Sequence, residues 1–202
     1  MDYSRIVLTG AGFLADAYDL FVINIVVDIM DQVSYKQELT DNMKATIKAM
    51  ALIGAVVGQV FFGSCADLIG RRTIFITTCT LVIFAALMSA TVTDSETFGI
   101  YSQLALWRFW LGVGVGGEYP LSAAITSESA SPETRIRSLA MVFSMQGFGT
   151  LLCSIVLIIV TQCVSSYENQ WRIALGFGGF PMVCAFYFRW KMHETLWTEK
   201  VF

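Results

Sequence analysis

Apolar residues run along this chain in long stretches that are separated by short polar connections. A helix that crosses the hydrocarbon core of a bilayer needs about 20 predominantly apolar residues. The sequence offers six such stretches, near residues 6–27, 47–66, 73–92, 100–126, 138–163 and 172–190. The pattern therefore predicts an all-α membrane protein in which residues 1–202 form one bundle of six transmembrane helices.

The composition supports a lipid bilayer as the surrounding solvent. Hydrophobic residues make up 55% of the chain, charged residues make up 14%, and the mean hydropathy is +0.63, which is far from the balance of a water-soluble domain. The first apolar stretch holds Asp16 and Asp19 in its middle and shows no small-residue cleavage site after it. We therefore interpret it as a retained helix and not as a signal peptide.

The basic residues gather at every second connection, which predicts the orientation of the bundle. They are Arg5 before the first stretch, Arg71 and Arg72, Arg135 and Arg137, and Arg189 with Lys191 and Lys200. The other connections are acidic or mixed, so the basic set is expected to face the cytoplasm together with both chain ends. Because the net charge is −3 and the bases form no stripe, a nucleic-acid partner is not expected.

The cysteines and the single histidine give little reason to expect an enzyme or a metal site. All five cysteines lie in or at the edge of apolar stretches without a close pair, and His193 lies at the end of the last stretch. No spacing suits a zinc site, and no nucleophile stands near a base. We expect no catalytic residue, no metal and no cofactor.

Asp16 and Asp19 are out of place in a membrane and predict a polar interior. They are three residues apart on one helix and so project from the same face. An ionised carboxylate in the hydrocarbon region costs several kcal/mol and tends to take up a proton. Such a group can carry a proton across the membrane; the structural alternative is that one of the acids only anchors a neighbouring helix by a hydrogen bond.

The fourth stretch carries a third acid, Glu118, directly after a run of glycines. Gly112, Gly114 and Gly117 have the spacing of a dinucleotide-binding fingerprint, but no β-strand precedes them. Gly112 and Gly116 are four residues apart instead, a spacing that lets two helix backbones approach closely. The glycines therefore predict a close helix crossing beside a buried carboxylate.

Other polar residues near this acid predict a binding cavity. Pro120 is expected to bend the helix just beyond Glu118, and Arg108 is positioned either to attract an anion or to balance an acid. Gln146 in the fifth stretch either contacts a substrate or binds a neighbouring helix. Asp16 and Glu118 fall in the first helix of successive blocks of three, which is either the mark of an inverted repeat or a chance similarity.

The connection between the second and third stretches reads GSCADLIGRR over residues 63–72. It resembles the signature loop of the major facilitator superfamily, which has the form Gly-x-x-x-Asp-x-x-Gly-Arg-Arg. The resemblance implies a cytoplasmic latch whose ion pairs change between inward-open and outward-open states. Its residues would be Gly63, Asp67, Gly70, Arg71 and Arg72. A plain positive anchor would account for the arginines but not for the spacing of Gly and Asp.

Three further segments resemble the proton-coupled inorganic phosphate transporters of that superfamily. They are GFLADAYDLF over residues 12–21, the run from Arg108 to Glu128 that contains GGEYPLS, and QGFG over residues 146–149. The resemblance implies that Asp16, Asp19 and Glu118 couple transport to protons. It also implies that Arg108, Tyr119 and Gln146 bind substrate, with H⁺ as the coupling ion.

The chain departs from that family in three respects. Glu118 stands where the family usually has Asp, and residues 193–197 read HETLW where a Pro-Glu-Thr-Pro-Arg run is common. The family also has twelve spans arranged as two halves, each a 3+3 inverted repeat. We expect residues 1–202 to be the N-terminal half, without the C-terminal six-helix half, and to work with a separate half or with a second copy.

The sequence thus predicts proton-coupled symport of inorganic phosphate by a multi-pass protein of the plasma membrane. Two alternatives stay open. One is a carrier of sugars, phosphate esters or organic ions from the same superfamily. The other is a truncated fragment or sensor that does not transport.

Overall fold

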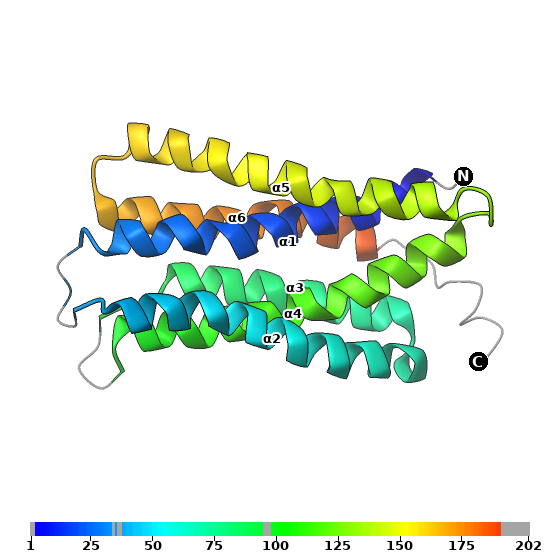
Figure 1. The fold of residues 1–202 in the computed structure, drawn as a ribbon, viewed down its shortest axis with the longest axis horizontal. Helices are drawn as coiled ribbons and strands as arrows, with labels where there is room; N and C mark the ends of the chain where they lie inside the picture. Colours follow the sequence, from blue (N-terminus) through cyan, green and yellow to red (C-terminus); the bar gives the residue numbers. More distant parts are fainter. Residues whose placement is uncertain (1–2, 34, 36–37, 95–97, 191–202) are drawn as a thin grey trace.

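The computed structural model describes residues 3–33, 35, 38–94 and 98–190, and this part of the chain folds into six long α-helices without a β-strand. The helices are α1 (Tyr3–Met30), α2 (Asp41–Ile69), α3 (Arg71–Ala90), α4 (Ile100–Ser129), α5 (Arg135–Cys163) and α6 (Tyr167–Trp190). They lie side by side and run alternately in opposite directions (Figure 1). The prediction of an all-α, six-helix bundle is confirmed.

The helices form two groups of three, with α1, α5 and α6 on one side and α2, α3 and α4 on the other (Figure 1). The main contacts join α2 to α4, α1 to α5, α3 to α4 and α1 to α6, and α3 meets α6 between the groups. The first three helices and the last three make equivalent contacts. If α1 is exchanged with α4, α2 with α5 and α3 with α6, the same five helix pairs are in contact. The bundle therefore has the 3+3 arrangement that the positions of Asp16 and Glu118 suggested.

Connections of the same kind gather at the same end of the bundle. The α2–α3 and α4–α5 connections, the start of α1 and the end of α6 lie at one end, and the other three connections lie at the opposite end (Figure 1). The basic residues Arg71, Arg72, Arg135 and Arg137 all belong to the first end. The side of the membrane that this end faces stays a prediction.

The contact between α2 and α4 brings two helix backbones together. Four glycines, two on each helix, lie directly against carbonyl oxygens of the partner helix: Gly54 against Phe109, Gly58 against Val113, Gly112 against Ala51 and Gly116 against Ala55. A Cβ atom at any of these positions would collide with the partner backbone. The close crossing predicted from Gly112 and Gly116 is confirmed, and α2 supplies a matching pair of glycines.

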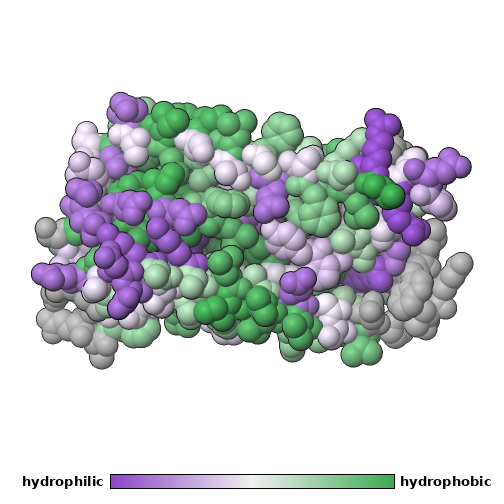
Figure 2. All heavy atoms as spheres, viewed as in Figure 1, coloured by the Kyte–Doolittle hydropathy of each residue, from purple (hydrophilic) through white to green (hydrophobic). Residues whose placement is uncertain are grey.

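The outer surface of the bundle is apolar where lipid would lie. Large hydrophobic side chains such as Val56 and Val60 on α2 and Ile158 and Ile159 on α5 are exposed, and hydrophobic residues cover the outer sides of these helices in the face shown in Figure 2. Within the described residues, three segments are long and apolar enough to cross a membrane: Asp41–Ala66, Arg71–Ala90 and Arg135–Cys163. Helices α1, α4 and α6 carry the buried charged residues.

Candidate functional site

The two acids of α1 lie inside the bundle. Asp16 and Asp19 both have 0% of their surface exposed. Gly178 on α6 has no side chain, and a Cβ atom there would collide with the carboxylate of Asp19. The glycine therefore leaves the space that Asp19 occupies between α1 and α6.

Arg108 on α4 is the cation beside Asp19. It is fully buried, and its Nη1 donates a hydrogen bond of 2.9 Å to the backbone carbonyl oxygen of Asp19. Its Nε and Nη2 have no hydrogen-bond partner among the described residues. Because both carboxylate oxygens of Asp19 lack a hydrogen-bond partner among the described residues, the two roles that the sequence allowed for Arg108 both stay predictions.

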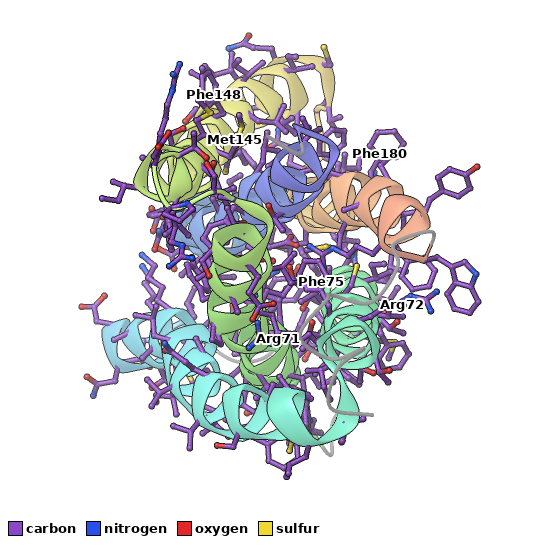
Figure 3. The ribbon with its side chains drawn as sticks, turned by 90° about the vertical axis from the view of Figure 1, so that its right-hand side faces the viewer. Arg71, Arg72, Phe75, Met145, Phe148 and Phe180 are labelled. Carbon is purple, nitrogen blue, oxygen red and sulfur yellow. The ribbon has the colours of Figure 1, made fainter. Side chains whose placement is uncertain are left out.

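Glu118 on α4 forms a buried ion pair with Arg189 on α6. Nη1 of Arg189 lies 2.5 Å from Oε1 of Glu118, and Nη2 lies 2.7 Å from Oε2, so the pair is bidentate. The guanidinium also stacks over the ring of Phe75, 3.9 Å from its centroid. Figure 3 shows Phe75 in the middle of the bundle, between α3, α4 and α6. Removing one partner of such a buried pair would leave the other charge uncompensated, which is strongly destabilising.

The ion pair overturns the interpretation of Arg189 as an inner-face charge. Arg189 has 0% of its surface exposed, so Arg108 shares the interior of the bundle with a second buried base. Gly12 on α1 leaves space for the pair, because a Cβ there would collide with Nη2 of Arg189 and lie 3.1 Å from Oε2 of Glu118. The side chain of Arg189 therefore points into the bundle, towards α1 and α4.

Asp16 lies next to this ion pair and has no donor of its own. Neither of its carboxylate oxygens accepts a hydrogen bond from a described residue. The side chain that it meets is Glu118, and Arg189 and Asp19 act on it electrostatically. The structure thus brings the three predicted proton-coupling acids into one interior region, with Asp16 in the middle.

Tyr119 and Gln146, the two predicted phosphate ligands, lie together at the margin of the bundle. Both are half-buried, and Nε2 of Gln146 lies 3.5 Å from the hydroxyl oxygen of Tyr119. The ring of Phe13 on α1 packs edge-on against Tyr119 with centroids 4.8 Å apart. Arg108 precedes Tyr119 by eleven residues on α4, or about 16 Å along the axis. The structure therefore does not bring Arg108 to the other two ligands.

The predicted latch residues tie the start of α3 to the ends of two other helices. Arg71 forms an ion pair with Glu128 in the last turn of α4, and Nη2 of Arg72 donates a 2.7 Å hydrogen bond to the carbonyl oxygen of Trp190 at the end of α6. Figure 3, which looks onto this end, labels both arginines. The side chain of Asp67 lies outside the described part of the structure, so its predicted ion pairs stay a prediction.

Gly70 of the same segment stands between α2 and α3 with a φ of 106°, a conformation that residues with a Cβ rarely adopt. We expect Gly70→Ala to lower the free energy of unfolding by about 1–3 kcal/mol. Thermal unfolding of the purified chain in detergent measures this loss. The matched control is Gly63→Ala, where the nearest atom to the new Cβ, Cγ of Pro120, is 3.7 Å away. Equal losses in both variants would contradict the prediction.

The described residues contain no group of three or more His, Cys, Asp or Glu side chains placed to hold a metal ion. The five cysteines are free, and Cys79 and Cys153 are buried. His193 lies outside the described residues.

Comparison with protein families shows where this arrangement belongs. The family described as "Sugar (and other) transporter" matches residues 6–200. The chain belongs to this transporter family. Its members are transporters and not enzymes, and the chain is accordingly an integral membrane protein.

Relatives of this transporter-family chain include plant proteins named as phosphate transporters. It is 42% identical over 199 residues to the putative inorganic phosphate transporter 1-13 of Oryza sativa subsp. japonica, covering 96% of the chain and 39% of the relative. It is 35% identical over 218 residues to the low affinity inorganic phosphate transporter 1 of Petunia hybrida, covering 96% and 41%. The chain thus spans about two fifths of the length of these relatives.

Solved structures with the same fold include the xylose transporter XylE from E. coli. Its partially occluded inward-open form matches with a TM-score of 0.83 and 21% identity, covering 96% of this chain and 48% of that one. The major facilitator superfamily proton:xylose symporter XylE bound to 6-bromo-6-deoxy-D-glucose matches with a TM-score of 0.85 and 22% identity, covering 96% and 45%. At this identity the likeness concerns the fold, which is that of the major facilitator superfamily.

Arg189 is the site residue of this transporter-family chain that the sequence analysis missed, and α6 does hold a signal for it. Met182, Ala185 and Arg189 follow one another at helical spacing, and all three are buried. Gly178 extends the same face by one more turn. Arg189 lies on the same face of α6 as these buried residues. This shared face, and not the positive charge at the end of α6, indicates that Arg189 lies inside the bundle.

Proposed function

We propose that this chain forms a six-helix unit of a proton-coupled inorganic phosphate symporter, with H⁺ as the coupling ion and no other cofactor. The observation that carries the proposal is the group of buried acids on α1 and α4, which continues along α4 directly into Tyr119. Relatives named as inorganic phosphate transporters support phosphate as the solute. Solved structures of the same fold whose names include a proton:xylose symporter support proton coupling.

Charge provides the link between protons and phosphate. Inorganic phosphate carries about one to two negative charges near neutral pH, so ionised carboxylates in a region of low dielectric constant repel it. Protonation of the acid cluster of Asp16, Asp19 and Glu118 from outside removes that repulsion, and phosphate then binds beside Tyr119 and Gln146. Loss of the proton on the inside restores the repulsion and releases phosphate.

Alternating access needs two bundles that move about a shared cavity. Tyr119 and Gln146 lie at the margin of this bundle, where a second six-helix unit would complete the site. We propose that this second unit is a second six-helix half or a second copy of this chain. The complete transporter lies in the plasma membrane, with the basic end of the bundle and both chain ends in the cytoplasm.

Uptake of labelled phosphate into vesicles tests the proposal. Three kinds of vesicle are compared. The first contains the chain alone, the second contains the chain together with the part of the rice relative that it does not match, and the third contains that part by itself as a control. We expect uptake that requires a pH gradient, stops when a protonophore is added, and is competed by phosphate but not by xylose. Cross-linking in the same vesicles identifies the partner; uptake by a strictly monomeric chain would contradict the need for a second unit.

A sugar or phosphate-ester carrier is the second candidate, because the family description includes sugars and the solved structures named above are of a xylose transporter. The competition experiment separates the two functions. Uptake of labelled xylose or of a labelled phosphodiester that unlabelled phosphate does not inhibit, without uptake of labelled phosphate, would favour this candidate. Phosphate binding by the chain without flux into any of these vesicles would favour a sensor.

A further inference from the structure

The buried charges of the bundle do not balance. Among the described residues, the charged side chains classed as buried are three acids and two bases: Asp16, Asp19, Glu118, Arg108 and Arg189. If all five are ionised, the interior carries one negative charge in excess. An uncompensated buried charge is costly, and uptake of a proton by an acid is the usual way in which proteins avoid it.

We propose that the buried acids hold a single proton, shared between Asp16 and Glu118, and that Arg189 is the positioning residue that limits the number to one. This inference rests on the proposed proton coupling and deepens it. Three acids alone would need three protons to become neutral, whereas the two arginines leave one acid to be neutralised.

The contacts of Asp16 point to the place of that proton. Its carboxylate meets Glu118, yet neither of its oxygens has a hydrogen-bond donor among the described residues. Both carboxylates are acceptors when ionised, so a hydrogen bond between them exists only when one of them carries a proton. Sharing one proton therefore satisfies Asp16 and removes the excess charge in the same step.

Arg189 is held in a position that suits a permanent counter-ion. Both of its terminal nitrogens are engaged by Glu118, and Phe75 lies against the face of the guanidinium. A guanidinium does not lose its proton in proteins, so Arg189 contributes a fixed positive charge. Gly12 on α1 leaves the space for this arrangement, one helical turn before Asp16.

Arg108 cannot take over this task. It precedes Glu118 by ten residues on α4, which is about 15 Å along the helix, and it lies against Asp19 instead. The other titratable groups that act on this region are Cys79 of α3 and Tyr119 of α4 near Asp16, and Cys153 of α5 and Tyr18 of α1 near Asp19. None of these groups supplies a positive charge.

Infrared spectroscopy of the chain in lipid nanodiscs tests the proposal without measuring transport, because a protonated carboxyl group has its own carbonyl band. We expect one buried protonated carboxyl in the native chain and none in Asp16→Asn. Arg189→Gln should raise the band roughly twofold, because Glu118 then needs a second proton. Arg189→Lys keeps the charge and should keep the single band, and the exposed Asp28→Asn on the same helix serves as control.

A pair of variants keeps the test decisive if Arg189→Gln fails to fold. Glu118→Gln leaves two acids and two bases, so the band should vanish although Asp16 is intact. The double variant Glu118→Gln with Arg189→Gln removes one charge of each sign, so the band should return. A band that survives Asp16→Asn, or stays absent in the double variant, would overturn the proposal.

Transport measurements keep this inference separate from the proposed function. If the band behaves as expected while the reconstituted vesicles show no uptake driven by pH, the single-proton site stands and the symport function fails. If uptake is driven by pH while the native chain shows no protonated carboxyl, the single-proton site fails and the symport function stands.

Discussion

Replacing Arg189 by glutamine is expected to lower the free energy of unfolding by about 3–5 kcal/mol, because it leaves the carboxylate of Glu118 buried without a partner. Glu118 has 0% of its surface exposed, and Asp16 next to it also lacks a donor. Thermal unfolding in detergent, followed by circular dichroism, measures the effect.

Two further variants decide whether the charge itself is responsible. Glu118→Gln combined with Arg189→Gln removes both ionised groups and should recover most of the stability, since replacing both partners of a buried pair is often close to neutral. Arg137→Gln, which removes an exposed arginine, should change the free energy of unfolding by less than about 0.5 kcal/mol. A double variant as unstable as the single one would point to lost packing over Phe75.

Gly58→Ala is expected to destabilise the bundle by about 1–3 kcal/mol or more, although alanine favours a helix over glycine. The new Cβ would collide with the backbone carbonyl of Val113, and a backbone atom cannot move aside as the end of a long side chain can. The same thermal measurement in detergent detects the loss.

Gly147→Ala is the matched control for the α2–α4 contact. It lies within α5, and no heavy atom lies within 4 Å of a Cβ placed there. The higher helix propensity of alanine should by itself raise the free energy of unfolding by up to about 1 kcal/mol. The two Gly→Ala exchanges should therefore change stability in opposite directions. A loss at Gly147 as large as that at Gly58 would show that the α2–α4 contact is not the cause.

The sequence located every helix but not where each one ends. An apolar stretch near 47–66 was predicted, whereas α2 begins at Asp41 and continues to Ile69. Hydropathy detects the part of a helix that suits hydrocarbon. It does not detect polar turns that extend the helix beyond the apolar stretch, such as the turn with Lys44 and Lys48. Helix α5 likewise begins at Arg135 instead of residue 138.

The burial of the acids was predictable, and their partners were not. Asp16, Asp19 and Glu118 stand within apolar stretches, so the cost of an isolated charge already implied a shielded position. Arg189 stands at the end of its stretch beside Lys191, where a basic residue usually reaches the membrane surface. Which way its side chain turns depends on the face that α6 presents to α1 and α4, and that face is set by tertiary packing.

The backbone contact between α2 and α4 also limits how the bundle can change shape. With glycines of both helices seated against carbonyl oxygens, neither helix can slide along the other without a Cα meeting a carbonyl group. No side chain lies between them at these points to turn into another rotamer and take up the displacement. The two helices therefore move as one rigid piece, and any rearrangement falls on contacts that side chains mediate, such as the packing of Phe13 against Tyr119.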